Sequence, residues 1–200
     1  MKVVQGSIDS ADMCVVFGLT LAKARTHLDM LRLMGIDCEG WGRSWRRKGT
    51  SEDKYTDPEV VAVFHWCLTD VFQFSLSEAG EILKGLGKRE ILGSLGIGKG
   101  VANPHTKSPY CKDRVKLCWI QFCDCQFEYD AWDGEPCNTF AIMVSPPDRP
   151  GDHLRTTEFV SMASRFIDGE TSDPKKVMEA IDSASIFGVD FREVFNIAIG

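Results

Sequence analysis

Arg89–His105 reads REILGSLGIGKGVANPH, and we expect the rest of the chain to be organised around this stretch. Four glycines fall within the eight residues that begin at Gly93, a density that ordinary helices and strands do not show. A loop of this kind exposes backbone N–H groups, and beside Arg89 and Lys99 such groups are suited to an anion, most often a phosphate. His105 follows directly, where its ring can hydrogen-bond that phosphate or accept it covalently.

Composition places the chain among ordinary globular proteins. It has 200 residues, of which 44% are hydrophobic and 26% charged, enough to bury the core of one domain. Its net charge of −6 argues against a general nucleic-acid binder. No apolar run approaches the roughly 20 residues that span a bilayer, and the run Met13–Ala22 follows a segment with the wrong charge balance for a signal peptide. We therefore expect a cytoplasmic protein without direct membrane insertion.

The eight cysteines form no paired C-x2-C arrangement. Cys118, Cys123 and Cys125 lie close together, which leaves a zinc site as the lesser alternative. Cysteines scattered through apolar segments usually behave as small buried hydrophobic residues. We expect reduced thiols and no bound metal.

Residues 1–50 differ from the remainder in charge. They hold eight Lys and Arg against five Asp and Glu, a balance of +3, which leaves −9 for the rest of the chain. Apolar residues at helical spacing predict a helix over Ala11–Met34. We interpret this region as a mostly helical extension on the main domain, with a solvated basic loop at residues 43–48. The alternative is a small helix-turn-helix-like module whose basic wing meets DNA phosphates.

The pattern from residue 57 onward predicts an α/β domain, preceded by a linker at residues 51–56. Helices and strands are interleaved there without strict alternation, which favours a mixed β-sheet sandwiched by helices. A helix that begins after Ser77 is expected to end at Gly85 and Gly87. The other predicted elements are helices from Asp57-Pro58, near Asp152, from Asp173-Pro174 and from Asp190, strands at Val115–Phe122 and Thr139–Val144, and a turn at Asp133-Gly134.

The four histidines are not equivalent. His27 and His65 fall within amphipathic helices, where we expect them at the surface or hydrogen-bonded in the core. His153 lies in the first turn of a predicted helix, whose dipole favours a neutral imidazole. Two neutral imidazoles can divide phosphoryl transfer between them, because one attacks phosphorus while the other donates a hydrogen bond to the phosphoryl oxygens. With His105 as the nucleophile, Arg89 would neutralise charge on the transferring group.

The glycine pattern fits neither a Walker nor a Rossmann motif. The whole stretch closely resembles the signature of the fructose, mannitol and nitrogen type of enzyme IIA domains in the bacterial phosphotransferase system, typically R-E-x-x-G-S-T-G-I-G-x-G-x-A-I-P-H. The resemblance continues through Asp133–Pro136 and Asp152–Leu154 and covers about residues 57–200. Two positions depart from it: Leu95 replaces a threonine, and Asn103 replaces an aliphatic residue and could hydrogen-bond the loop or retune the histidine.

The resemblance implies a role for each matching residue. His105 would be the phosphorylated nucleophile, His153 the donor that stabilises the phosphoryl group, and Arg89 the residue that neutralises its charge. The fold implied is a mixed sheet sandwiched by helices, and neither a metal nor an organic cofactor is implied. The phosphate-binding loop would comprise Gly93, Ser94, Gly96, Gly98 and Gly100.

The activity implied by the resemblance is that of a phosphotransferase acting as a relay. The chain would accept a phosphoryl group from an HPr-like phosphocarrier on His105 and pass it to a cysteine of a IIB-type partner. This relay would serve sugar uptake or nitrogen and carbon regulation. The alternative is a regulatory binding module, in which the IIA-like domain senses phosphorylation and residues 1–50 bind DNA or protein.

Overall fold

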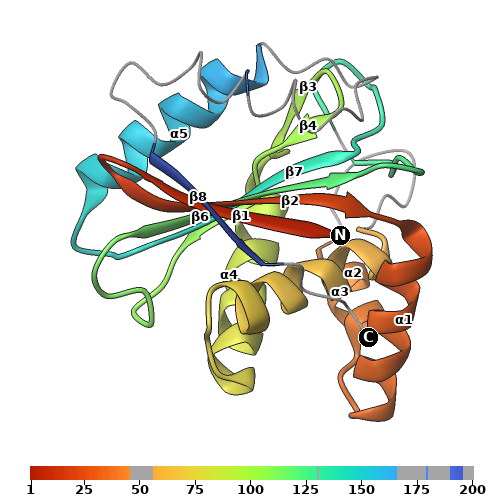
Figure 1. Cartoon of the computed structure of the whole chain (residues 1–200). Coiled ribbons are helices and arrows are strands. Elements are labelled where there is room, and N and C mark those ends of the chain that lie inside the picture. The colour runs from red at the N-terminus through yellow and green to blue at the C-terminus, as the bar shows by residue number, and fades with distance from the viewer. Residues whose placement is uncertain (46–55, 130, 166–178, 180–189, 196–200) are drawn as a thin grey trace.

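The structure is a computed structural model that describes residues 1–45, 56–129, 131–165, 179 and 190–195. Its described strands form one mixed sheet with helices on both faces (Figure 1), which confirms the predicted fold class. The strand order is β3-β4-β7-β6-β2-β1-β8, and β5 pairs with β7 beyond the end of β4. The strands are β1 Lys2–Ile8, β2 Ala11–Leu19, β3 Gly96–Gly98, β4 Val101–Ala102, β5 His105–Lys107, β6 Val115–Phe122, β7 Thr139–Ser145 and β8 Asp190–Phe195. The helices are α1 Leu21–Leu33, α2 Cys38–Ser44, α3 Pro58–Trp66, a π-helical turn η1 Cys67–Val71, α4 Leu76–Leu92 and α5 Pro150–Ser164.

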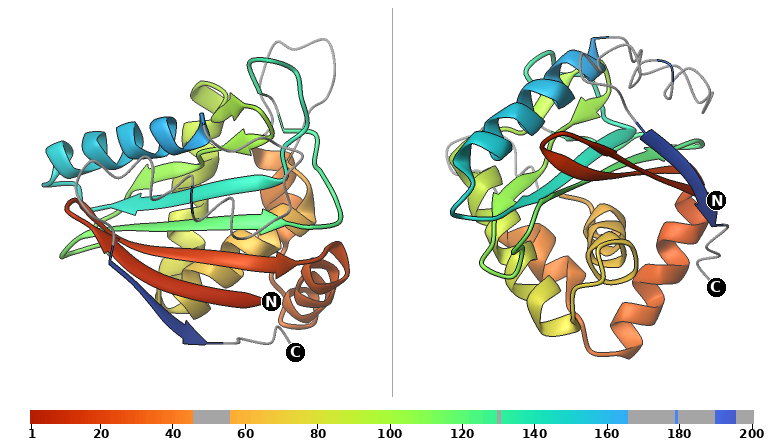
Figure 2. Two further views of the ribbon diagram at one scale, coloured as in Figure 1. Left: turned by 45° about the horizontal axis from the view of Figure 1, so that its top comes forward. Right: turned by 60° about the vertical axis from the view of Figure 1, so that its left-hand side comes forward.

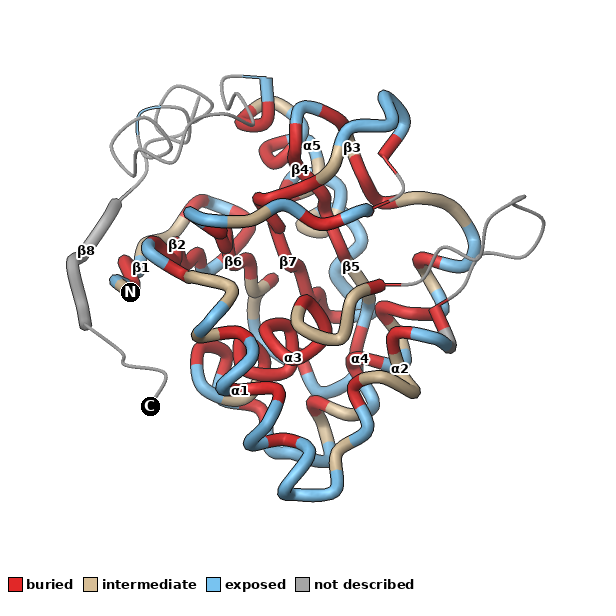
Figure 3. The backbone as a smooth tube through the Cα atoms, turned by 90° about the vertical axis from the view of Figure 1, so that its right-hand side faces the viewer, coloured by how far each residue is buried: buried red, intermediate tan, exposed pale blue. Residues whose placement is uncertain are grey.

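Two hydrophobic cores lie on opposite faces of the sheet. Figure 2 shows the helices that cover each face. Residues of α1, α3 and α4 join one core with alternate residues of the central strands, such as Cys118 and Ile120. Phe159 and Val160 of α5 join the other core together with Leu117. Strand β7 is apolar from Phe140 to Val144 because it is buried on both faces, and β6 is buried along most of its length although it contains Lys116 and Gln121. Figure 3 shows burial concentrated along these two strands and α3.

The predicted helix over Ala11–Met34 is wrong across its first part. Residues 11–19 form β2, which pairs with β1 on one side and with β6 on the other. The apolar run in β2 serves both cores, with Val16 in one and Val15 in the other, and periodicity alone does not separate such a run from a helix. The helix begins at Leu21, after Thr20 accepts a hydrogen bond from the backbone N–H of Lys23.

The N-terminal region therefore contributes two strands and two helices to the same sheet and core as the later elements. The helical part of our expectation corresponds to α1 and α2. The predicted linker lies outside the described residues except for Thr56, and so do residues 46–48 of the predicted basic loop, whereas Arg43 and Ser44 are the last residues of α2 and not part of a loop.

Helix α4 is longer than predicted. It begins after Ser75, which forms a capping box with Glu78, and it continues past both glycines to Leu92. The glycines permit close packing, because a Cβ at Gly85 would lie 2.8 Å from Thr106 Oγ1 and one at Gly87 would overlap the indole of Trp45. As a consequence, Arg89 lies on a helix and not on a loop.

The remaining predictions had mixed outcomes. Helices α3 and α5, strands β6 and β7, and the turn at Asp133-Gly134 are confirmed. The helix predicted from Asp190 is wrong, because these residues form β8 and pair with β1. The helix predicted from Asp173-Pro174 lies almost wholly outside the described residues. None of the helices described is long and apolar enough to cross a membrane.

Candidate functional site

His105 and His153 meet at one end of the sheet. His105 opens β5, opposite Met143 of β7, and His153 lies in the first turn of α5, a few residues after β7 ends. Their ring centroids are 5.3 Å apart and their planes meet at 63°, an edge-to-face arrangement. The fold thus brings together the two histidines that the sequence analysis selected.

His105 has one ring nitrogen tied to the backbone. Its Nδ1 lies 2.9 Å from the carbonyl oxygen of Asn103. Since a carbonyl oxygen only accepts hydrogen bonds, the neutral ring carries its proton on Nδ1 and leaves a lone pair on Nε2. Burial lowers the pKa of His105, Arg89 lowers it further, and the hydrogen bond to Asn103 opposes both. The ring is therefore neutral at pH 7, with Nε2 available as a nucleophile.

Asn103 fills a gap between β4 and β5. Both strands pair with β7, but the intervening Pro104 has no N–H to donate to the ladder. The side-chain amide of Asn103 donates to the Ala141 carbonyl at 2.6 Å, while its backbone N–H donates to the carbonyl of Leu95 at 2.8 Å. The departure from the family pattern thus supplies a donor to β7 and secures the backbone that holds His105.

His153 is held by a residue that the sequence analysis did not select. Its Nδ1 lies 2.7 Å from Ser145 Oγ, at the end of β7. Burial is the largest cause that lowers the pKa of His153 to about 4, followed by the charges of His105, Lys107 and Arg89. The ring is therefore neutral, as expected, although burial is the main reason. The only local signal of Ser145 was a single polar residue between an apolar strand and a proline pair.

Arg89 supplies positive charge to this site from the last turn of α4. Its charge lowers the pKa of both histidines, which places it near both rings. Its Nη1 is 4.0 Å from the position that a Cβ would occupy at Gly93. The described part of the chain contains no carboxylate in ion-pair contact with Arg89, so its guanidinium is available to an incoming anion.

The predicted phosphate-binding loop divides into two parts. The carbonyl of Leu95 accepts a hydrogen bond from the backbone N–H of Asn103, two residues before His105. Gly93 and Ser94 come directly before Leu95, so this part of the loop lies near His105. The second part forms the tight β3–β4 hairpin, in which Gly98, Lys99 and Gly100 have φ angles of +89°, +54° and +73°.

This hairpin lies away from the histidine pair. Val101 is opposite Thr139 and His105 is opposite Met143, so the hairpin is separated from His105 by four residues of strand, roughly 13 Å. The N–H of Lys99 already donates to Asp133 Oδ2 at 2.8 Å, and that of Gly96 donates to Ser94 Oγ at 3.1 Å. The structure therefore does not place Gly98 and Gly100 beside His105, and their part in binding phosphate stays a prediction.

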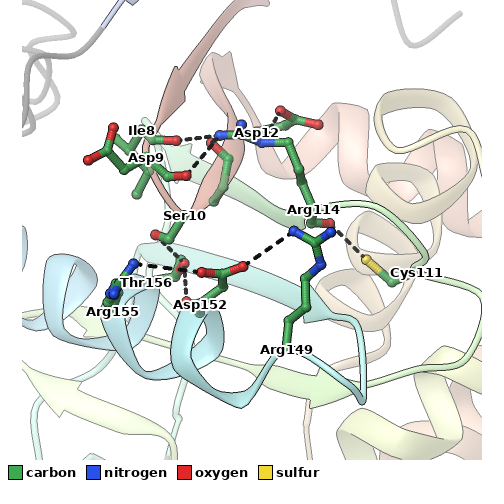
Figure 4. A network of polar contacts seen from close by, with 11 residues as sticks. Ile8, Asp9, Ser10, Asp12, Cys111, Arg114, Arg149, Asp152, Arg155 and Thr156 are labelled. Carbon is green, nitrogen blue, oxygen red and sulfur yellow. Dashed lines mark hydrogen bonds and ion pairs between the residues drawn. The ribbon is translucent and has the colours of Figure 1, made fainter.

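The β1–β2 hairpin supports the helix that carries His153 (Figure 4). Ser10 Oγ and Thr156 Oγ1 are 2.8 Å apart, and Thr156 donates to the Asp152 carbonyl at 2.8 Å. The Arg114 guanidinium donates to the Ile8 carbonyl at 2.5 Å and so fastens the hairpin to β6. No local pattern predicted this support, because it joins residues 146 positions apart.

His27 and His65 form a second pair, away from this site and between α1 and α3. Their ring centroids are 6.2 Å apart, and both side chains are buried. Their ring nitrogens have no hydrogen-bond partner among the described residues. The expectation of surface or hydrogen-bonded histidines is therefore wrong.

The cysteines are all unpaired, and six of the eight are buried. Within the described ranges, no group of three or more His, Cys, Asp or Glu residues could hold a metal ion.

Comparison with known proteins places the chain beside nitrogen regulatory proteins. The one from Pseudomonas aeruginosa is 31% identical over 77 residues, which cover 38% of this chain and 49% of that protein. The one from Bradyrhizobium diazoefficiens is 26% identical over 108 residues, which cover 54% of this chain and 67% of that protein. The predicted resemblance to the fructose, mannitol and nitrogen type of IIA domains is confirmed, and these relatives carry the name of its nitrogen-regulatory members.

The match spans about half the length of the Pseudomonas relative. Among solved structures, the nitrogen regulatory protein IIA-Ntr from Neisseria meningitidis is 27% identical, with 52% of this chain and 73% of that chain covered and a TM-score of 0.42. No protein-family model matches the chain.

Proposed function

We propose that this chain is a phosphoryl carrier of the phosphotransferase system. The observation that carries the proposal is the pair of neutral imidazoles, 5.3 Å apart and within the electrostatic reach of Arg89. Such an arrangement provides a nucleophile, a hydrogen-bond donor and a fixed positive charge around one small space. The nitrogen regulatory relatives support the same conclusion.

In the first step, the Nε2 lone pair of His105 attacks the phosphorus of a phosphohistidine on an HPr-like carrier. The new N–P bond forms as the bond to the donor nitrogen breaks, and that nitrogen keeps the electron pair. The hydrogen bond from Nδ1 to the Asn103 carbonyl stabilises the positive charge that the His105 ring acquires. His153 and Arg89 stabilise the phosphoryl oxygens in the loose transition state.

In the second step, a thiolate on a IIB-type partner attacks the phosphorus and His105 returns to its neutral form.

Because the relatives are named nitrogen regulatory proteins, we favour a regulatory role over sugar uptake. The alternative of DNA binding through residues 1–50 has less support, because β1 and β2 are part of the central sheet. DNA binding by the full chain at low salt would restore that alternative.

The proposal is tested by incubating the full chain with phosphoenolpyruvate, enzyme I and an HPr-like carrier. Intact mass should rise by one acid-labile phosphoryl group, and His105→Ala should abolish the increase. His153→Ala should still accept the group but transfer it slowly, because the nucleophile remains and the donor is lost. His27→Leu is the matched control and should behave like the wild type. Label that persists in His105→Ala would refute the assignment.

A further inference from the structure

Ser145 is buried at the junction between β7 and α5. Its side chain is 0% exposed, and its hydroxyl has two neighbours: Nδ1 of His153 at 2.7 Å and the carbonyl oxygen of Thr106 at 3.4 Å. A serine hydroxyl has a single proton, so it donates to only one of them at a time. Which neighbour receives that proton determines where the neutral His153 ring carries its own.

We propose that Ser145 is a positioning residue that donates to Nδ1 of His153 and thereby keeps the proton of that ring on Nε2. His153 then presents a neutral N–H to the phosphoryl group on His105. This role in transfer rests on the proposed function, whereas the position of the proton does not.

The two distances decide between the possible hydrogen bonds. At 2.7 Å the contact with Nδ1 has the usual length of a bond donated by a hydroxyl and is shorter than the roughly 2.9–3.0 Å usual for a bond donated by an N–H, whereas 3.4 Å to the Thr106 carbonyl is long for an O–H donor. If Ser145 donated to Thr106, Nδ1 of His153 would have to be the donor in the shorter contact. Nε2 would then hold a bare lone pair, which repels phosphoryl oxygens. Donation from Ser145 to Nδ1 of His153 is also the arrangement that leaves an N–H on Nε2 to face the phosphoryl group.

A second proton on His153 would remove the difference between the two tautomers, but the ring does not bind one at neutral pH. Burial and the charges of His105, Lys107 and Arg89 keep the pKa of this ring at about 4, so it holds one proton at neutral pH. Its tautomer therefore decides whether it donates or accepts.

The two histidines are held in opposite tautomers by neighbours of opposite character. The carbonyl of Asn103 only accepts, which fixes the His105 proton on Nδ1 and leaves Nε2 as the nucleophile. The hydroxyl of Ser145 donates, which leaves Nδ1 of His153 bare and puts its proton on Nε2. In this way one pair of identical side chains provides both a nucleophile and a donor.

The side chain of Ser145 can be changed without breaking the sheet. Its backbone is opposite Lys107 in the pairing of β5 with β7, and its carbonyl accepts a hydrogen bond from the Ser108 N–H at 2.9 Å. Ser145→Ala therefore removes the hydroxyl and keeps these contacts. Ser145→Thr restores the hydroxyl, and Ser164→Ala is a matched control, since it removes a hydroxyl bonded to the Ser161 carbonyl at the far end of α5.

The test is nitrogen NMR of ¹⁵N-histidine-labelled protein at pH 7.5, without partner proteins. Wild type, Ser145→Thr and Ser164→Ala should show the His153 proton on Nε2, whereas Ser145→Ala should show a mixture of tautomers. In the relay assay, Ser145→Ala should transfer its phosphoryl group about three- to tenfold more slowly, the effect of one lost hydrogen bond, and Ser145→Thr should restore the rate.

A wild-type His153 that carries its proton on Nδ1 would overturn the inference. So would a Ser145→Ala variant with an unchanged tautomer. If the wild type showed the expected tautomer but accepted no phosphoryl group, the proposed function would fail while the assignment of Ser145 stood.

Discussion

The buried pair formed by His27 and His65 should make the stability of the protein depend on pH. The two side chains are 5% and 2% exposed, and Trp41 stacks on His65 with a centroid distance of 6.4 Å. Burial lowers the pKa of His27 to about 4, with His65 as the second cause and Asp70 opposing. Burial also lowers the pKa of His65, again with Asp70 opposing. The folded state therefore holds both rings neutral at pH 7.

The direction of the effect follows from proton linkage. Below about pH 6.5 the unfolded chain binds protons on these histidines, whereas the folded chain does not until pH approaches the lowered pKa. The free energy of unfolding thus falls as pH falls, by about 1.4 kcal/mol per pH unit wherever a histidine is protonated in the unfolded chain and neutral in the folded one. From pH 6.5 to 5, His27 alone removes about 2 kcal/mol, given its pKa of about 4. His65 acts in the same direction.

Urea unfolding of wild type and His27→Leu at pH 7.5 and 5 measures this contribution. Leucine has a similar bulk and no orphaned nitrogen, so we expect the variant to be no less stable at pH 7.5. Between the two pH values it should lose about 2 kcal/mol less than the wild type does. The difference isolates His27, because His105 and His153 are present in both proteins. Equal losses in the two proteins would show that His27 is protonated in the folded state and would refute the reasoning.

Three further predictions concern the main site and its supports. Asn103→Leu leaves the Ala141 carbonyl without its donor, so urea unfolding should show a loss of about 1–3 kcal/mol, and an unchanged midpoint would contradict the assigned hydrogen bond. Gly87→Ala places a Cβ against Trp45, and calorimetry should show destabilisation of about 1–3 kcal/mol, whereas Gly151→Ala, with open space around its Cβ, serves as the control. Phosphoryl acceptance should fall less from pH 7.5 to 6 than the titration of a free imidazole would require, because burial lowers the pKa of His105 below its ordinary value. Initial rates that fall in proportion to a pKa near 6.5 would contradict this prediction.

The sequence predicted the parts of the fold that carry strong local signals. The proline after Asp57 marks the start of α3, Val115–Phe122 was correctly predicted as a strand, and the apolar run from Thr139 to Val144 was correctly predicted as a buried one. The motif placed the two histidines and Arg89 in one site, and the structure brings them together. In these cases the residues themselves specify either the backbone or the chemistry.

The parts that failed depend on contacts between distant segments. Strand β2 has an apolar run that periodicity cannot separate from a helix, and only its pairing with β6 decides the matter. Helix α4 passes through two glycines because Trp45 and Thr106 fill the space beside them, which compensates for their low helix propensity. The contact between Ser145 and His153 could not be predicted from the sequence either, because the two side chains meet only when α5 packs back over the sheet.

The position of β5 explains how such a site stays both rigid and accessible. In the described part of the sheet, β5 pairs with β7 alone, so His105 lies on an edge strand of three residues. Helix α4, which carries Arg89, packs on one face of the sheet, and α5, which carries His153, packs on the other (Figure 2). The hydrogen bonds of Asn103 and Pro104 to β7 hold this short strand in register. A carrier that must meet two partners in turn needs its nucleophile exposed to both, and a paired central strand would bury it. A three-residue edge strand leaves the half-buried histidine accessible from one side and is too short to offer another chain a template for strand pairing.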